Sequence, residues 1–169
     1  MTFKIGDRIV HPQHGVGQVV KLEERQFEPG MMRQYYEISI REGGTVWVPT
    51  DLSISGLRNL AKRSEIDRCR EILMSRPAPL TDDVRTRQSN LASRLKQGTI
   101  RTRCEVVRGL YAYGEHKSLY GSMAGFFKQT QNVLCQEWAI VEGVTQPEAV
   151  HEVNSLIEKS RQTVKKSKV

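Results

Sequence analysis

The spacing of apolar residues changes near residue 60, and this change constrains the fold more strongly than any other feature of the sequence. Before it, short runs of alternating apolar and polar residues are separated by glycine and proline turns, which is the pattern of strands. After it, apolar residues recur every three or four positions, as in helices with one buried face. The sequence therefore predicts an α+β protein with two domains, a β-rich one over residues 1–60 and an all-α one over residues 61–169.

The first domain is predicted to contain four or five short strands. Tyr36, Ile38 and Ile40 alternate onto one face of the clearest of them, while Pro29-Gly30 and Gly43-Gly44 have the composition of tight turns. So many strands in so short a segment favour a small antiparallel barrel of the Tudor-like or SH3-like type, because closing the sheet protects its edges. The predicted strands cover residues 8–10, 18–22, 35–40 and 45–48.

The second domain is predicted to contain five helices. Ser64 and Thr99 have side chains favoured as helix N-caps, and Thr145 and Glu148 have the spacing of a capping box. Two prolines interrupt the helical pattern, so residues 76–83 are expected to form a corner or linker. The predicted helices cover residues 65–75, Thr81 to Gln97, 100–113, 118–142 and 145 through Ile157, followed by a basic tail at 160–169.

The cysteines argue for a core role. Cys69, Cys104 and Cys135 are widely spaced, odd in number, and lie on apolar helical faces together with Trp138. Such spacing disfavours a disulfide framework or a zinc site, and we expect a reducing cytoplasm. The sequence has no apolar run long enough to span a membrane, and the first residues do not resemble a secretion signal.

Motifs of common enzymes are missing from the sequence. It has no phosphate-binding GxxxxGK[ST] loop, no GxSxG nucleophile motif and no HExxH zinc motif. His11 and His14 lie three residues apart beside a glycine turn, so they are either half of a metal site or turn residues with local partners. We predict no catalytic residue, no metal and no cofactor.

Positive charge gathers in residues 84–108. The whole chain has 26 Lys and Arg against 19 Asp and Glu, a net charge of +7, and this stretch alone has seven basic residues and one acid, Glu105. Solvated helix faces usually interleave both signs, which gives stabilising ion pairs. The stretch is thus either an ordinary solvated face or a surface that binds phosphates without reading sequence.

Besides the basic stretch, Trp47 is a candidate for contact with a partner. In the predicted strand it lies on the face opposite Val46 and Val48, so it is exposed if these two valines point into the barrel. An exposed tryptophan near arginines is a common anchor of protein interfaces. The alternative is that Trp47 packs against the helical domain.

Several motifs, in order across residues 1–145, resemble those of the CarD/CdnL family of bacterial transcription regulators. The most specific is His11-Pro12-Gln13-His14-Gly15-Val16-Gly17, which follows the opening Phe3-Lys4-Ile5-Gly6-Asp7. The others are Val48-Pro49, Gly56-Leu57-Arg58, Glu105-Val106-Val107-Arg108-Gly109-Leu110 and Glu137-Trp138-Ala139-Ile140-Val141-Glu142.

This resemblance implies a Tudor-like domain that binds the β subunit of RNA polymerase, related to that of transcription-repair coupling factor. It also implies helices that contact promoter DNA at the upstream edge of the bubble and stabilise the open complex. We expect a monomer that is cytoplasmic and associated with the nucleoid through the polymerase. Polymerase binding is assigned to Arg25, Trp47, Arg33 and Arg41, and DNA binding to Val84, Arg85, Arg87, Arg94, Lys96, Arg101 and Arg103.

The chain departs from the family pattern at the expected DNA contact. Val84 stands where the family has a tryptophan wedge, and Thr86 replaces one of two arginines, although Arg87 matches the other. On the polymerase side, Arg25 matches a contact residue, while Trp47 replaces a common basic one. We hypothesise a divergent member with weaker or altered open-complex stabilisation. The alternative is an adaptor that binds polymerase or another protein and has no DNA wedge.

Overall fold

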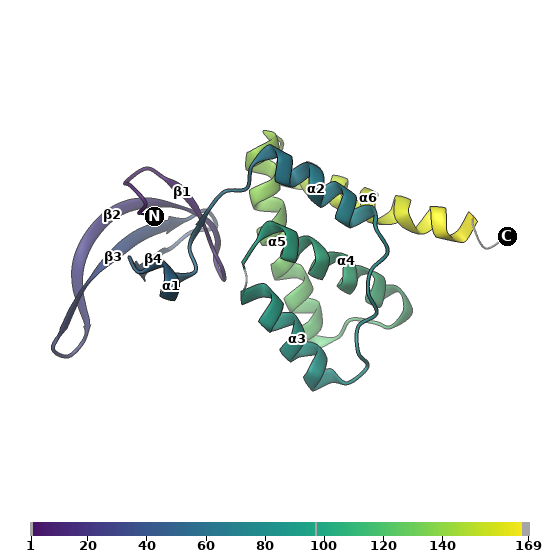
Figure 1. Ribbon diagram of the computed structural model, residues 1–169, viewed down its shortest axis with the longest axis horizontal. Helices are drawn as coiled ribbons and strands as arrows, with labels where there is room; N and C mark the ends of the chain where they lie inside the picture. The colour runs from purple at the N-terminus through teal and green to yellow at the C-terminus, as the bar shows by residue number, and fades with distance from the viewer. Residues whose placement is uncertain (1, 97, 167–169) are drawn as a thin grey trace. The chain divides into compact units, whose positions relative to one another are not determined.

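A computed structural model of the chain describes residues 2–96 and 98–166 (Figure 1). The chain divides into two compact units, Met1–Leu60 and Ala61–Val169. The first contains the sheet and the second the long helices, which confirms the predicted α+β class. Each unit is described by itself.

The N-terminal unit is an antiparallel sheet of five strands with the order β4-β3-β2-β1-β5. A short helix, α1 (Leu52–Ser55), and the last strand were not predicted, because both are too short to show a period. Among the described residues no pairing joins β4 to β5, so the expected barrel is open along these two strands. The strands are β1 (Arg8–His11), β2 (Gly15–Glu28), β3 (Met31–Ile40), β4 (Thr45–Pro49) and β5 (Arg58–Asn59).

The hairpin of β2 and β3 is much longer than the sequence predicted. The two strands pair from Gly17 opposite Ile40 to Glu28 opposite Met31, with Pro29-Gly30 as the turn. A register shift between Val19 and Lys21 moves later side chains to the other face, and this shift is why the alternation in β2 looked imperfect. The distal residues pack no core and are held by backbone pairing, so hydrophobicity alone could not reveal them.

The core of this unit lies on one face of the sheet. Buried side chains from successive strands, among them Ile9, Val19 and Ile38, pack together. The hydroxyl of Tyr36 accepts a hydrogen bond from the backbone N–H of Phe3 at 3.1 Å. At Gly17 a Cβ would lie 2.6 Å from Ile38 Cγ2, so the sheet needs glycine at this position. Gly17 of the HGVG motif therefore serves packing, whereas Gly15 has a φ of 76°, a backbone conformation that favours glycine.

The C-terminal unit contains five helices within its described residues, close to the predicted ranges. Helix α2 begins at Arg63 and not after Ser64, because the Glu65 carboxylate accepts the N–H of Lys62 at 2.7 Å and holds the first turn there. Helix α3 ends at Lys96 within the described residues, whereas Gln97, its predicted end, lies outside them. The helices are α2 (Arg63–Met74), α3 (Val84–Lys96), α4 (Ile100–His116), α5 (Gly121–Glu142) and α6 (Gln146–Lys166).

Helix α6 is longer than predicted. The capping box is present, since Thr145 N–H donates to Glu148 Oε2 at 2.8 Å and Glu148 N–H donates to Thr145 Oγ1 at 3.3 Å. The helix then continues to Lys166, so residues 160–166 are not the irregular tail we expected. Straight-chain basic residues and glutamine have high helix propensity, which outweighs the loss of apolar periodicity here. Residues 167–169 lie outside the described part of the chain.

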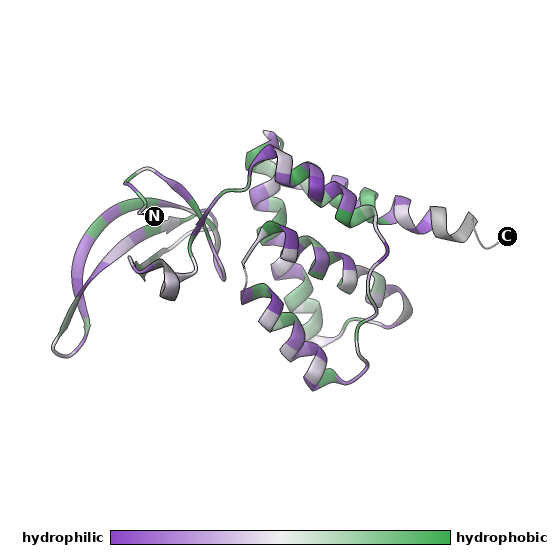
Figure 2. Ribbon diagram, viewed as in Figure 1, coloured by the Kyte–Doolittle hydropathy of each residue, from purple (hydrophilic) through white to green (hydrophobic). Residues whose placement is uncertain are grey.

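The helical core consists of two apolar clusters, a larger one shared by α2, α4, α5 and α6 and a smaller one of Leu91, Val106, Leu110 and Met123; Figure 2 colours these helices by hydropathy. Cys69, Cys104, Cys135 and Trp138 are all buried, as predicted. Burial raises the pKa of the Cys135 thiol to about 12, so it stays protonated and unreactive at neutral pH. The cysteines are packing residues of this core. No helix in the described ranges is both long and apolar enough to cross a bilayer.

Candidate functional site

One face of the sheet presents aromatic and charged side chains instead of a core. The register places Lys21 opposite Glu37 and Glu37 opposite Trp47, and it places Glu23 opposite Tyr35. Side chains two residues apart on a strand share a face, so Arg25 and Phe27 continue this row along β2. We name this row the Trp47 surface; it consists of Lys21, Glu23, Arg25, Phe27, Tyr35, Glu37 and Trp47.

A single carboxylate holds the centre of the Trp47 surface. Glu23 Oε1 accepts hydrogen bonds from Arg25 Nε at 2.5 Å and from the indole nitrogen of Trp47 at 3.1 Å, and Lys21 Nζ lies 2.6 Å from Oε2. The Arg25 guanidinium lies 4.4 Å from the centre of the Trp47 ring, which is a cation–π contact. Arginine and tryptophan are therefore fixed relative to each other without being buried.

The electrostatics of Glu23 reflect this arrangement. Hydrogen bonds from Lys21 first, and then from Arg25, lower the pKa of the Glu23 carboxyl to about 2. Its charge persists throughout the physiological range, so the contacts to Trp47 and Arg25 persist as well.

The Trp47 surface has the composition of a protein-binding surface. Trp47 is 38% exposed and Phe27 is 54% exposed, and the ring of Phe27 meets the ring of Tyr35 edge-on with centroids 4.9 Å apart. The prediction that Trp47 points away from Val46 and Val48 is confirmed, since Val48 is buried and Val46 packs against the core. Aromatic side chains beside arginine dominate the energetics of many interfaces.

The structure brings together only some of the residues that the sequence assigned to polymerase binding. Arg33 lies directly opposite Arg25 in the hairpin, beside the Trp47 surface. Arg41 follows the other end of β3, eight positions from Arg33, or about 26 Å along an extended strand. Sequence reasoning missed Glu23, Phe27 and Tyr35. The period-two spacing of Glu23 and Phe27 with Arg25 was a usable signal, but the first strand of the hairpin was predicted to end at residue 22. Tyr35 was inside a predicted strand, and its place on this surface follows only from the register that sets it opposite Glu23.

Two of the arginines assigned to DNA binding are buried. Arg87 is 6% exposed and its Nη1 donates to the backbone oxygens of Thr81 at 2.9 Å and Asp82 at 3.2 Å. Arg103 is 2% exposed and its Nη1 donates to the oxygen of Gly98 at 3.0 Å. In this conformation these side chains stabilise the turns on either side of α3 and do not reach the surface.

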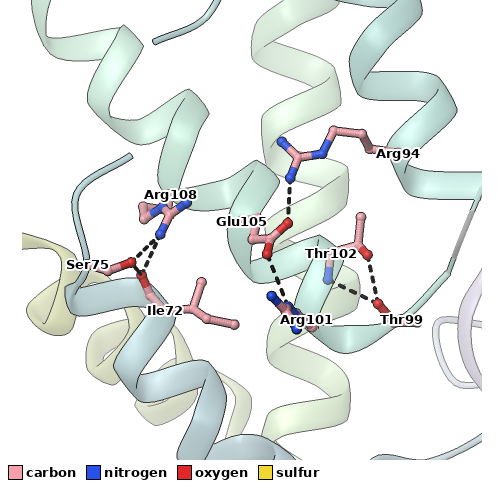
Figure 3. A network of polar contacts seen from close by, with 8 residues as sticks. All are labelled: Ile72, Ser75, Arg94, Thr99, Arg101, Thr102, Glu105 and Arg108. Atoms are coloured by element: carbon pink, nitrogen blue, oxygen red, sulfur yellow. Dashed lines mark hydrogen bonds and ion pairs between the residues drawn. The ribbon is translucent and has the colours of Figure 1, made fainter. Parts of the chain in front are cut away.

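The single acid of the basic stretch also offsets more charge than expected. Glu105 accepts from Arg94 Nη2 at 2.5 Å and from Arg101 Nε at 3.2 Å (Figure 3). Arg108 Nη1 donates to the last turn of α2, at the oxygen of Ile72, at 2.9 Å. The expectation that the arginines on α3 and α4 are uncompensated is therefore wrong for Arg94 and Arg101, which share the Glu105 carboxylate, whereas Arg108 is held by an uncharged backbone oxygen of α2.

The remaining candidates form two exposed groups on the helical unit. Val84, 55% exposed, and Arg85 begin α3. Lys96 ends that helix within the described residues, about 18 Å away along a helix of this length, and Arg101, whose side chain is 75% exposed, lies in the first turn of α4.

The two histidines show local contacts. His11 Nδ1 accepts the backbone N–H groups of Gln13 at 3.1 Å and His14 at 3.2 Å, which supports the turn interpretation over the metal one. Within the ranges that the structure describes, no group of three or more potential ligands could hold a metal ion.

Comparison with protein families finds a match for each of the two units. Residues 3–60 match the CarD-like/TRCF RID domain, and residues 68–154 match the CarD C-terminal domain. The chain belongs to the CarD family. The match confirms the resemblance noted in the motifs, and the RID domain implies an interaction with RNA polymerase. CarD-family transcription factors are not enzymes, which agrees with the missing catalytic motifs.

A curated relative of this CarD-family chain is named "Putative transcription factor YdeB", from Bacillus subtilis (strain 168). It is 28% identical over 148 residues, which cover 85% of this chain and 95% of the relative. The Trp47 surface lies in the part that matches the RID domain, and helices α3 and α4 lie in the part that matches the CarD C-terminal domain.

Proposed function

We propose that this CarD-family protein binds the β subunit of RNA polymerase through the Trp47 surface. It contacts promoter DNA near the upstream edge of the bubble through exposed cations on α3 and α4, and so modulates open-complex stability. The observation that carries this proposal is the arrangement of Arg25 and Trp47 around Glu23 on the RID sheet. It acts as a monomer, in the cytoplasm where transcription takes place.

Support for the polymerase contact comes from preorganisation. Binding usually costs the entropy of fixing long side chains, and here Arg25 is already held by a carboxylate and an aromatic ring. Phe27 and Tyr35 add exposed apolar area next to this pair. A partner with an acidic or aromatic counterpart would bind without reordering this face.

Support for the DNA contact comes from the exposed basic side chains. Arg85, Lys96 and Arg101 are exposed and lie on two helices joined by a short turn at Gly98. Such side chains bind phosphates through release of counterions and carry no base preference. Val84 is too small to stack on a base as an aromatic wedge would, so we propose a weaker wedge than the family pattern implies.

The polymerase contact is tested by binding of the full chain to RNA polymerase from the same source. The double variant Arg25→Glu, Trp47→Ala should weaken binding by about 100-fold or more, because both residues occupy the centre of the surface. Met32→Ala is the matched control, since Met32 is 59% exposed on the same hairpin but at a position whose register faces the opposite side of the sheet. Equal affinity of the double variant and the control would refute the proposal.

An adaptor without DNA contact is the second candidate. The burial of Arg87 and Arg103 and the pairing of Glu105 favour it, because they reduce the number of free cations. A complex of polymerase and promoter DNA separates the two candidates. If Arg85→Ala, Arg101→Ala leaves open-complex lifetime unchanged while polymerase binding is intact, the adaptor is correct.

A further inference from the structure

A cavity of about 360 Å³ lies within the helical unit, between α3, α4 and the segment 78–81 that precedes α3. Its size is within the range of pockets that hold small metabolites, roughly 300–1,000 Å³. We call it the α3–α4 cavity. Its polar lining includes Arg87, Arg94, Glu105 and Arg108, and its apolar lining includes Leu80, Leu91 and Val106.

The α3–α4 cavity has an excess of positive charge. Arg87, Arg94 and Arg108 face a single carboxylate, Glu105, which leaves two charges without an acid in the lining. Figure 3 shows Arg94 and Arg108 on either side of Glu105, with Arg94 bound to it and Arg108 directed to α2. Mutual repulsion of the arginines is thus only partly relieved by the protein.

Two of these arginines also keep donors that the protein does not use. The Nε atoms of Arg87 and Arg108 are buried and have no hydrogen-bond partner among the described residues. Burial lowers the pKa of Arg108; Glu105 opposes this shift and the nearby Arg94 adds to it. Burial and the Arg94 charge both favour an added anion, which would stabilise the charged guanidinium groups.

The apolar wall restricts what kind of anion fits. Leu91 is 2% exposed and Val106 is 1% exposed, and they border the cavity together with the half-buried Leu80. Gly109 also borders the cavity, next to the side chain of Leu80. An inorganic ion would leave this wall uncovered, whereas a flat organic group would cover it.

We infer that the α3–α4 cavity binds a small organic phosphate of about mononucleotide size, with the phosphate at the arginines and the organic part on the apolar wall. Planar guanidinium groups suit phosphate oxygens in two-point contacts. The inference is independent of the proposed DNA contact, because Arg85, Lys96 and Arg101 do not line the cavity.

Isothermal titration of the full chain with adenosine monophosphate and, separately, with inorganic phosphate tests this inference. The nucleotide should bind about tenfold more tightly than phosphate, because only it covers the apolar wall. Arg94→Gln should weaken nucleotide binding about tenfold, the equivalent of one charge-assisted hydrogen bond. Ser93→Glu, which adds a carboxylate to the lining, should abolish it, whereas Ser89→Glu, which adds the same charge to α3 outside the lining, should not.

Four results would overturn the inference. They are no heat with either probe at millimolar concentration, equal affinity for both probes, binding that survives Ser93→Glu, and loss of binding in Ser89→Glu alone. Binding of duplex DNA is measured as a further comparison. If duplex DNA binds, Ser93→Glu abolishes that binding and the free nucleotide does not bind, the cavity belongs to the DNA surface and not to a small ligand.

Discussion

At the scale of single residues, Glu23 organises the surface that we assign to polymerase binding. Its carboxylate accepts hydrogen bonds from both Arg25 and Trp47, which are the two central residues of the polymerase contact that we propose. An exposed salt bridge alone contributes little to stability. The value of Glu23 is therefore in orienting its neighbours.

Replacement of Glu23 should separate orientation from stability. We expect Glu23→Gln to weaken polymerase binding roughly three- to tenfold, because the charge that holds Arg25 is lost, while the urea unfolding midpoint changes little. Binding measurements and urea unfolding check both parts. A large loss of stability with unchanged affinity would show that Glu23 supports the sheet and not the interface.

The lowered pKa of Glu23 gives a pH dependence of defined sign. The folded protein keeps the carboxylate charged down to pH about 2, whereas the ordinary value is 4.5. The stabilisation is present above the unfolded pKa and is lost as the pH falls from that value through the folded one. The indole N–H resonance of Trp47 should thus stay constant from neutral pH down to about pH 3 and shift near pH 2. A midpoint near 4.5 would contradict the hydrogen-bonded geometry.

Val84 is the residue where restoring the family pattern should change activity. It begins α3 and is 55% exposed, so a larger side chain would cause no clash in the core. Val84→Trp should lengthen the promoter open-complex lifetime roughly five- to tenfold, the range expected for one aromatic stacked on a base. Val84→Ala should have little effect. An unchanged lifetime in Val84→Trp would refute the wedge interpretation.

At the scale of helices and strands, periodicity predicted the elements that bury a face and missed those that do not. Helices α4 and α5 appear within a few residues of their predicted ranges, because each has a continuous apolar stripe. The distal part of the β2–β3 hairpin was missed, because it packs no core. Short elements such as α1 depend on tertiary context and have no signal of their own.

In the basic stretch 84–108, too, the sequence alone could not show which residues are available for binding. Charge counting could not distinguish the exposed Arg85 from the buried Arg103, because both lie in the same local composition. Their difference depends on which helical face packs inward, and on Gly98, whose oxygen accepts from Arg103. Of the polymerase-binding candidates, Arg25 and Trp47 came from the sequence, while their link through Glu23 required the strand register.

Measurements of stability can test the difference in burial between Arg103 and Arg85. Arg103→Ala should reduce the free energy of unfolding by about 2 kcal/mol or more, because it removes a buried charged donor and leaves a gap beside α4. Arg85→Ala should change it by less than about 0.5 kcal/mol. Urea denaturation of the two variants measures this. Equal effects would show that burial does not separate structural from binding arginines here.

At the scale of the whole molecule, the chain consists of two units that match two family domains, and we propose one contact surface on each. The sheet unit presents an aromatic and cationic face, and the helical unit presents exposed cations. The first is suited to a specific protein partner and the second to a charged polymer of any sequence. In the function that we propose, one chain contacts polymerase and DNA at the same time, which would raise the effective concentration of the weaker contact.

The proposed contact between the helical unit and DNA should depend on salt concentration in a predictable way. Three exposed cations, Arg85, Lys96 and Arg101, allow about three phosphate contacts, so the logarithm of DNA affinity should fall with the logarithm of salt concentration with a slope near −3. Arg85→Ala should reduce that slope by about one. Fluorescence anisotropy over a salt series measures it. A slope near zero would contradict phosphate binding by the helices.

The most direct test of the account is the lifetime of a promoter open complex formed by RNA polymerase from the same source, measured with and without this protein. We predict that the intact protein changes the lifetime, that Arg25→Glu, Trp47→Ala removes the change, and that Met32→Ala retains it. If the double variant changes the lifetime as much as the intact protein does, the Trp47 surface is not the polymerase contact, and the central claim is wrong.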